Sequence, residues 1–196
     1  MRVLKLCVLA ALAFGAWQWG QAATVQAKAW LAPILIARAW TDSQVHDVDV
    51  KPWPWADTWP VAKLTVPTLG IEQYVLAGAN GAALPFGPGH MSGTSLPGQR
   101  GTIVIAGHRD THFAFAQNLQ PGTKIILESR GRQRSFYRVM RKSIVDARTQ
   151  QLAVDSGQDE LILVTCEPTS TFSARGPYRL VVSAAADGRA QDFSIY

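Results

Sequence analysis

Residues 161–166 read LILVTC and make the most apolar strand-like run of the chain beyond its N-terminal segment. A short run of aliphatic residues bounded by polar ones is typical of a buried β-strand. It ends at Cys166, and Glu-Pro and a polar stretch follow. Residues 102–106, TIVIA, form a second such run, which leads through Gly107 to His108. The sequence therefore predicts a thiol and an imidazole, each placed where a strand emerges from the core.

Short apolar runs recur through the rest of the chain after residue 60. In the first of them, Ala62, Leu64 and Val66 alternate with other residues, which suits a half-buried strand. The other expected strands cover residues 61–66, 71–77, 123–128, 134–140, 143–147 and 178–184, and short helices are expected at 111–119 and around 149–155. Many short strands at this spacing favour a barrel or a sandwich, so the predicted fold class is mostly β.

Length and composition exclude several classes of protein. The 196 residues suit one folded domain with a short extension, at roughly 150 residues per domain. Hydrophobic residues make up 47% and charged residues 17%, which excludes a disordered chain. Two cysteines are too few for a disulfide-stapled scaffold. The net charge of +5 is mild and no aromatic residues are interleaved with the basic ones, so nucleic acid is not an expected partner.

The N-terminal segment has the pattern of a membrane signal. Residues 3–19 are apolar except for Lys5 and a glutamine, and a helix of this length spans about 25 Å. Arg2 and Lys5 place positive charge before the run, which favours a cytoplasmic N-terminus. The interpretation is a single-pass anchor over residues 1–22 in the cytoplasmic (inner) membrane, with the main domain on the outer, periplasmic side. A cleaved signal peptide is the alternative, and it would export the same domain.

Residues 23–59 are expected to form a juxtamembrane helix and a linker rich in proline and tryptophan. Pro33 is expected to end, kink or start a helix within this segment. All seven tryptophans lie in the first 59 residues, and several prolines stiffen residues 52–60. The predicted domain boundary is near Pro60, so residues 60–196 make the folded domain.

Cys166 is the residue on which the prediction of chemistry depends. It is the only cysteine outside the N-terminal segment, and a thiol beside an imidazole is the minimal unit of covalent acyl transfer. A buried structural cysteine is one alternative, and a zinc site made of Cys166, His108 and His112 is another. Asp110 either orients a histidine or caps a helix starting at Thr111. The glycine-rich residues 77–101, which contain His90, are expected to be a loop bordering the site.

Taken together, these segments resemble the sortase family. The residues that carry the resemblance are Ala106-Gly107-His108, Val164-Thr165-Cys166 and Arg179, which follows the cysteine by 13 positions. Residues 60–71, 87–113 and 159–168 extend it. The HRDTHF stretch and the PGH loop resemble class GN, the proteobacterial group, and class D is the alternative. One departure is Ile162, which stands where the family usually has threonine.

The resemblance implies a closed, mostly antiparallel β-barrel of about eight strands with short helices. It also implies a cysteine transpeptidase that cleaves the C-terminal sorting signal of an exported protein through a thioester and transfers it to an amine. His108, Cys166 and Arg179 would be catalytic, with Arg175 as an alternative to Arg179. No cofactor and no metal are expected, since the chain lacks the acidic cluster through which class A relatives can use calcium. The rival functions are an exported Cys–His hydrolase that releases its substrate and a non-enzymatic envelope adaptor.

Overall fold

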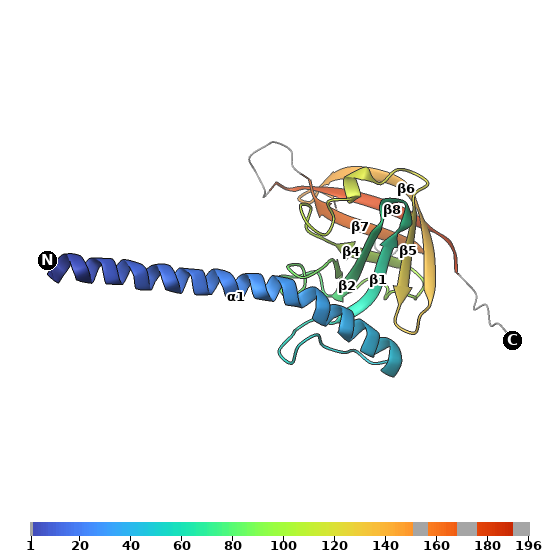
Figure 1. The fold of residues 1–196 in the computed structure, drawn as a ribbon. Helices are drawn as coiled ribbons and strands as arrows, with labels where there is room; N and C mark the ends of the chain where they lie inside the picture. The colour runs from blue at the N-terminus through green and yellow to red at the C-terminus, as the bar shows by residue number, and fades with distance from the viewer. Residues whose placement is uncertain (1, 151–156, 168–175, 190–196) are drawn as a thin grey trace.

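The computed structural model describes residues 2–150, 157–167 and 176–189. A long N-terminal helix, α1 (Arg2–His46), precedes a closed β-barrel and projects from it (Figure 1). The strands are β1 (Pro60–Val66), β2 (Ile71–Ala77), β3 (Gly89–His90), β4 (Thr102–Ala106), β5 (Lys124–Ser129), β6 (Arg134–Asp146), β7 (Glu160–Cys166) and β8 (Tyr178–Arg189), with single 3₁₀ turns at η1 (Pro67–Leu69) and η2 (Ala116–Asn118). The expectation of a mostly β, eight-stranded closed barrel is confirmed.

The order of strands around the barrel is β1-β2-β3-β4-β7-β8-β6-β5. The β2–β3 and β4–β7 pairs are parallel, and the other pairs are antiparallel. Because β4 and β7 run side by side in the same direction, the residues that follow both strands emerge at the same end of the barrel. β8 runs antiparallel to β7, so its first residues lie at that end too.

Side chains that alternate along the strands fill the barrel interior. On β7 these are Leu161 and Leu163, and on β8 they are Leu180 and Val182, all within one continuous core cluster. Alternation with period two places their neighbours on the outer face. A smaller apolar cluster covers that outer face of β4, β7 and β8, formed by Val104, Ile162, Val181, Met91, Val145 and Val164.

Three secondary-structure expectations need correction. Residues 134–140 and 143–147 belong to one strand, β6, which continues past a register irregularity between Val139 and Arg141. The helix expected at 111–119 is a series of turns with only η2 helical, because Phe113, Phe115 and Leu119 are drawn into the core from irregular backbone. The short strand β3 within the glycine-rich segment was not expected. Of the helix expected around 149–155, residues 151–155 lie outside the described residues.

α1 continues through Pro33, so the expectation that a helix starts or ends there is wrong. The residues after Pro33 gain their order from packing on the outside of β1 and β2, and this outweighs the one intrahelical hydrogen bond that a proline removes. Ile36 packs with Leu76, and the Trp40 ring lies 6.1 Å from that of Tyr74. In the described residues, no helix combines the length and the apolarity that a membrane crossing requires.

Candidate active site

Strand register brings the three predicted site residues to one end of the barrel. Cys166 on β7 and Arg179 on β8 are direct Cα partners in the antiparallel ladder. In the parallel ladder, Ala106 on β4 pairs with Val164 on β7. His108 and Cys166 each lie two residues beyond that pair, so the same register continued brings these two residues opposite each other. Alternation puts Cys166 on the outer face with Ile162 and Val164 rather than in the barrel interior.

The backbone that carries His108 is fixed to β7 from both sides of Gly107. The Gly107 N–H donates to the Val164 carbonyl at 3.1 Å, and the Thr165 hydroxyl donates to the Gly107 carbonyl at 2.8 Å. A Cβ at residue 107 would lie 2.7 Å from the Phe113 ring, so only glycine fits this approach. The Phe113 N–H in turn donates to the His108 carbonyl at 2.9 Å. These bonds hold the start of the 108–113 turn against the strand that ends in the cysteine.

The three side chains differ in exposure. His108 is exposed, whereas Cys166 and Arg179 are half-buried, and the thiol of Cys166 is free. An Arg179 guanidinium nitrogen donates to the carbonyls of Gly176 and Tyr178, both at 2.8 Å. The side chain thus lies at the start of β8, and Arg179 is the ladder partner of Cys166. Arg175, the predicted alternative, lies outside the described residues.

Ile162 lies on the outer face of β7 with Val104 and Val181 and is only 4% exposed. The departure from the family threonine therefore adds aliphatic surface to the apolar patch beneath the cysteine. An apolar surface beside a thiol is suited to the aliphatic part of a peptide.

The other histidines have separate places. His90 on β3 is buried, and its Nε2 makes hydrogen bonds with the Ser95 carbonyl at 2.9 Å and the Thr94 hydroxyl at 3.1 Å. Burial lowers the pKa of His90, so the side chain braces the glycine-rich loop in its neutral form. Burial also lowers the pKa of His112, and the charge of nearby His108 acts in the same direction. In the parts of the chain that the structure describes, no group of three His, Cys, Asp or Glu side chains is arranged to hold a metal ion.

A cavity of about 360 Å³ lies against the cysteine strand at the mouth of the barrel, and we call it the mouth cavity. His108, Cys166 and Arg179 do not line it, but the residues next to two of them in the sequence, Arg109 and Glu167, do. Its lining also includes Asp110, Phe113, Thr165 and Leu180. Arg109 forms a two-pronged ion pair with Asp110, at 2.7 and 2.9 Å, and this pairing lowers the pKa of Asp110. Sequence reasoning missed Arg109 and Glu167. The available signal was that each directly follows a predicted catalytic residue in the sequence, His108 or Cys166.

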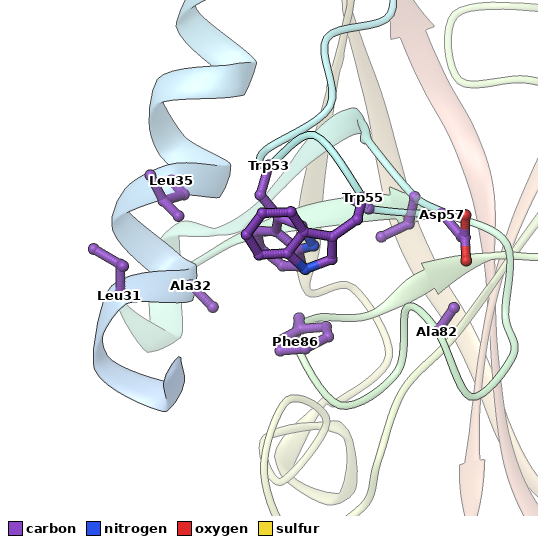
Figure 2. Close-up of a pocket in the computed structure, with 10 residues that line it drawn as sticks. Leu31, Ala32, Leu35, Trp53, Trp55, Asp57, Ala82 and Phe86 are labelled. Atoms are coloured by element: carbon purple, nitrogen blue, oxygen red, sulfur yellow. The ribbon is translucent and has the colours of Figure 1, made fainter. Parts of the chain in front are cut away.

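A different cavity, of about 390 Å³, lies between α1, the linker and the loop after β2 (Figure 2). Leu31 and Leu35 of α1 line it together with Trp53, Trp55 and Phe86. None of the predicted catalytic residues lines this cavity. A third one, of about 710 Å³, lies toward the opposite end of the barrel, near His90 and Arg130. Cys166 lines neither of these two cavities.

The fold and the site together define a class, a closed β-barrel protein with a cysteine and a histidine at the ends of adjacent parallel strands. Comparison with known proteins then identifies the family. Residues 64–187 match the family described as the sortase domain, and the chain belongs to the sortase family. Members of that family are cysteine transpeptidases.

Individual relatives agree with this assignment. The chain is 31% identical over 121 residues to sortase D of Bacillus subtilis (strain 168), covering 61% of this chain and 60% of that protein. Sortase A from Corynebacterium diphtheriae superposes with a TM-score of 0.60 at 25% identity, covering 71% of this chain and 65% of the other. The fold is also shared with a sortase D5 transpeptidase of Clostridium perfringens, with a TM-score of 0.61 at 18% identity, covering 80% and 96%. The chain thus spans less than two thirds of the length of the first two relatives.

Proposed function

We propose that this protein is a membrane-attached cysteine transpeptidase, which cleaves the C-terminal sorting signal of an exported protein and transfers the new C-terminus to an amine. The observation that carries the proposal is the register at the barrel end: Cys166 pairs with Arg179, and the β4–β7 ladder leads to His108. Membership of the sortase family supports the same reaction class.

In the proposed acylation step, the Cys166 sulfur attacks the scissile carbonyl carbon and the peptide C–N bond breaks. His108 delivers a proton to the departing nitrogen, so the leaving fragment departs as an amine. Arg179 exchanges its carbonyl partners for the developing oxyanion, which a planar guanidinium can stabilise in place. The acyl chain then rests on the outer apolar patch that contains Val104, Ile162 and Val181.

Attachment to the cytoplasmic membrane, with the barrel on its outer side, is proposed from the sequence of residues 3–19 and the basic residues in and before them. Exposed apolar side chains nearer the barrel support a lipid contact. Trp30 on α1 is 74% exposed and Trp55, at the rim of the cavity in Figure 2, is 79% exposed. Large aromatic rings of this kind are favoured at membrane–water interfaces. Within the sortases, assignment to class GN rests on residues 108–113 and 88–90.

The reaction class is tested by intact-mass spectrometry. The protein is mixed with peptides covering the C-terminus of an exported protein encoded beside it, and the expected result is an acyl adduct on Cys166. Product analysis with and without an added amine separates transfer from hydrolysis, since a hydrolase gives the same free acid in both. A Cys166→Ala variant that still cleaves the peptide would overturn the proposal.

A further inference from the structure

The mouth cavity lies on a different side of the nucleophile from the outer apolar patch. On β7, Val164 and Cys166 alternate with Thr165 and Glu167, and the Glu167 N–H continues the ladder by donating to the Tyr178 carbonyl at 3.0 Å. Cys166 therefore belongs to the outer face, whereas Thr165 and Glu167 line the mouth cavity. His108 and Arg109 follow β4 in the turn that begins there, and Arg109 lines the mouth cavity whereas His108 does not. Cys166 thus has the outer apolar patch on its own face, while its two chain neighbours, Thr165 and Glu167, line the mouth cavity.

A transpeptidase needs two surfaces of this kind. The acyl donor remains bound through its thioester while the acceptor approaches the same carbonyl carbon, so the acceptor requires a route that the donor does not fill. The outer patch is apolar and suits the donor chain. The mouth cavity, at about 360 Å³, is large enough for the end of a second peptide or a small amine.

The charges in the mouth cavity favour a cation. Its lining holds one guanidinium and two carboxylates, those of Arg109, Asp110 and Glu167. Arg109 directs two of its nitrogens to Asp110, which neutralises that pair. Among the described residues, Glu167 forms no ion pair within salt-bridge distance, and it directly follows the nucleophile in sequence. Arg109 also interacts electrostatically with Glu167 and with Cys166, so its charge reaches both. The lining as a whole, with one guanidinium and two carboxylates, still carries a net negative charge.

We propose that the mouth cavity is the acceptor subsite and that the Glu167 carboxylate binds the incoming amine in its ammonium form. This inference rests on the proposed transpeptidase function. The bound ammonium loses one proton, to His108 or to water, and the free amine attacks the thioester carbonyl carbon. A C–N bond forms, the C–S bond breaks, and the second amine proton ends on the sulfur. The products are an amide, the Cys166 thiol and one released proton.

The test loads the thiol without requiring the natural sorting signal. In the full chain carrying Cys7→Ser, Cys166 is the only thiol, and p-nitrophenyl acetate is used to acetylate it. The rate at which the acetyl adduct is lost is then measured by intact mass with two kinds of nucleophile. Glycinamide and ethylenediamine are cationic at neutral pH, whereas hydroxylamine is uncharged there.

For Glu167→Gln, the rate with the cationic amines is expected to fall about tenfold, the size expected for one charge-assisted hydrogen bond at a partly exposed site. The rate of acetylation and the rate with hydroxylamine should not change. The difference between wild type and variant should also shrink as salt is raised. The matched control is Glu160→Gln, at the other end of β7 and about 23 Å away along the strand, which should change neither rate.

The outcomes separate the two proposals. Cys166 that fails to acetylate, or an acetyl adduct that amines do not remove, contradicts the transpeptidase function itself. An adduct that amines remove equally fast from wild type and Glu167→Gln leaves the function intact and overturns the acceptor subsite. If Glu167→Gln lowers the rate of deacetylation by the same factor with the cationic amines and with hydroxylamine, Glu167 acts on the geometry of the site and not on the charge of the acceptor. That result also overturns the acceptor subsite.

Discussion

At the scale of single residues, substitution of Cys166 is expected to remove the activity without disturbing the fold. Its thiol is free, half-buried and at the end of a strand, so removing the sulfur takes little from the barrel core. Cys166→Ala is expected to abolish peptide cleavage while the far-ultraviolet circular dichroism spectrum stays unchanged. Residual activity above about 0.1% of wild type would contradict the thioester mechanism, because loss of a nucleophile removes several orders of magnitude of rate.

The proposed role of Arg179 depends on the planar geometry of its guanidinium group as well as on its positive charge. Arg179→Ala is expected to lower transpeptidation by roughly 10²–10³-fold, the usual cost of losing one oxyanion donor. Arg179→Lys should recover little of this, because a point charge does not reproduce a planar fork. The measurement is kcat/KM from a steady-state assay of both variants.

The control for this prediction is Arg134→Ala, an exposed arginine on β6 that pairs with Glu128, and it should leave kcat/KM unchanged. Arg175→Ala should cost about tenfold at most. If Arg175→Ala proved the more damaging of the two losses, the oxyanion role would pass from Arg179 to Arg175.

At the scale of elements, the junction between β4 and the turn that follows it determines where His108 lies. Gly107→Ala would place a methyl group 2.7 Å from the Phe113 ring, which is itself fully packed in the core. Overpacking of this kind costs about 1–3 kcal/mol of unfolding free energy. We expect that loss in urea denaturation, together with a fall in kcat/KM as the 108–113 turn is displaced.

Gly81→Ala is the matched control for the overpacking prediction. No atom lies within 4 Å of the position where its added Cβ would stand, so the stability and activity of this variant should equal those of wild type. An unchanged Gly107→Ala variant would show that Phe113 can move aside without affecting the site.

The glycine-rich loop between β3 and β4 makes stability depend on pH through His90. Burial lowers the pKa of His90 in the folded state, while the unfolded chain keeps the ordinary value of 6.5. Below 6.5 the unfolded state therefore binds more protons, so the free energy of unfolding decreases as the pH falls. Each histidine contributes at most about 1.4 kcal/mol per pH unit, and the partly buried His112 acts in the same direction.

We expect urea unfolding at pH 7.5 and pH 5.5 to show this loss in wild type and a smaller difference in His90→Gln. The variant is expected to be less stable than wild type at pH 7.5, since it alters the hydrogen bonds to Ser95 and Thr94. The pH dependence of His46→Gln, at the exposed end of α1, should match that of wild type. An unchanged pH dependence in His90→Gln would contradict the assignment.

At the scale of the whole molecule, α1 has two parts with different relations to the barrel. Its second half packs on β1 and β2 through Ile36 and Trp40, and Gln44 bonds to the Ser129 carbonyl and the Arg132 N–H at the β5–β6 turn. Its first half projects away from the barrel (Figure 1). The barrel therefore requires the second half of the helix for cover.

Trp40→Ala is expected to destabilise the protein by about 3–5 kcal/mol, because its ring is 5% exposed. In a domain of this size, that corresponds to a fall of about 10 °C or more in the midpoint of thermal unfolding. Trp30→Ala on the exposed part of the same helix is the matched control and should leave the midpoint unchanged. Equal effects of the two substitutions would contradict the packing of α1 on the barrel.

Many of the barrel strands could be predicted from sequence, because the alternation of apolar and polar residues along a strand can be read within a few neighbouring residues. The runs that contain Leu64, Ile105 and Leu163 indicate strands, either because apolar residues occur at every second position or because the run is continuously aliphatic. The candidate site residues could also be picked out from sequence, since Cys166 ends such a run and His108 comes two residues after another. The expectations of a helix end or start at Pro33 and of a helix at residues 111–119 were wrong, because packing against the barrel decided whether those segments are helical.

Sequence by itself therefore determined the strands, the candidate nucleophile and histidine, and the family resemblance. Only the tertiary structure decided that β4 and β7 are parallel neighbours, which brings the chain segments that carry His108 and Cys166 together although these residues are 58 positions apart in the sequence. It also decided that Arg109 and Glu167 share a cavity and that Trp40 covers Tyr74. The physical reason is that strand pairing and burial are set by contacts between segments far apart in the chain, and no local pattern of residue types encodes which segments meet.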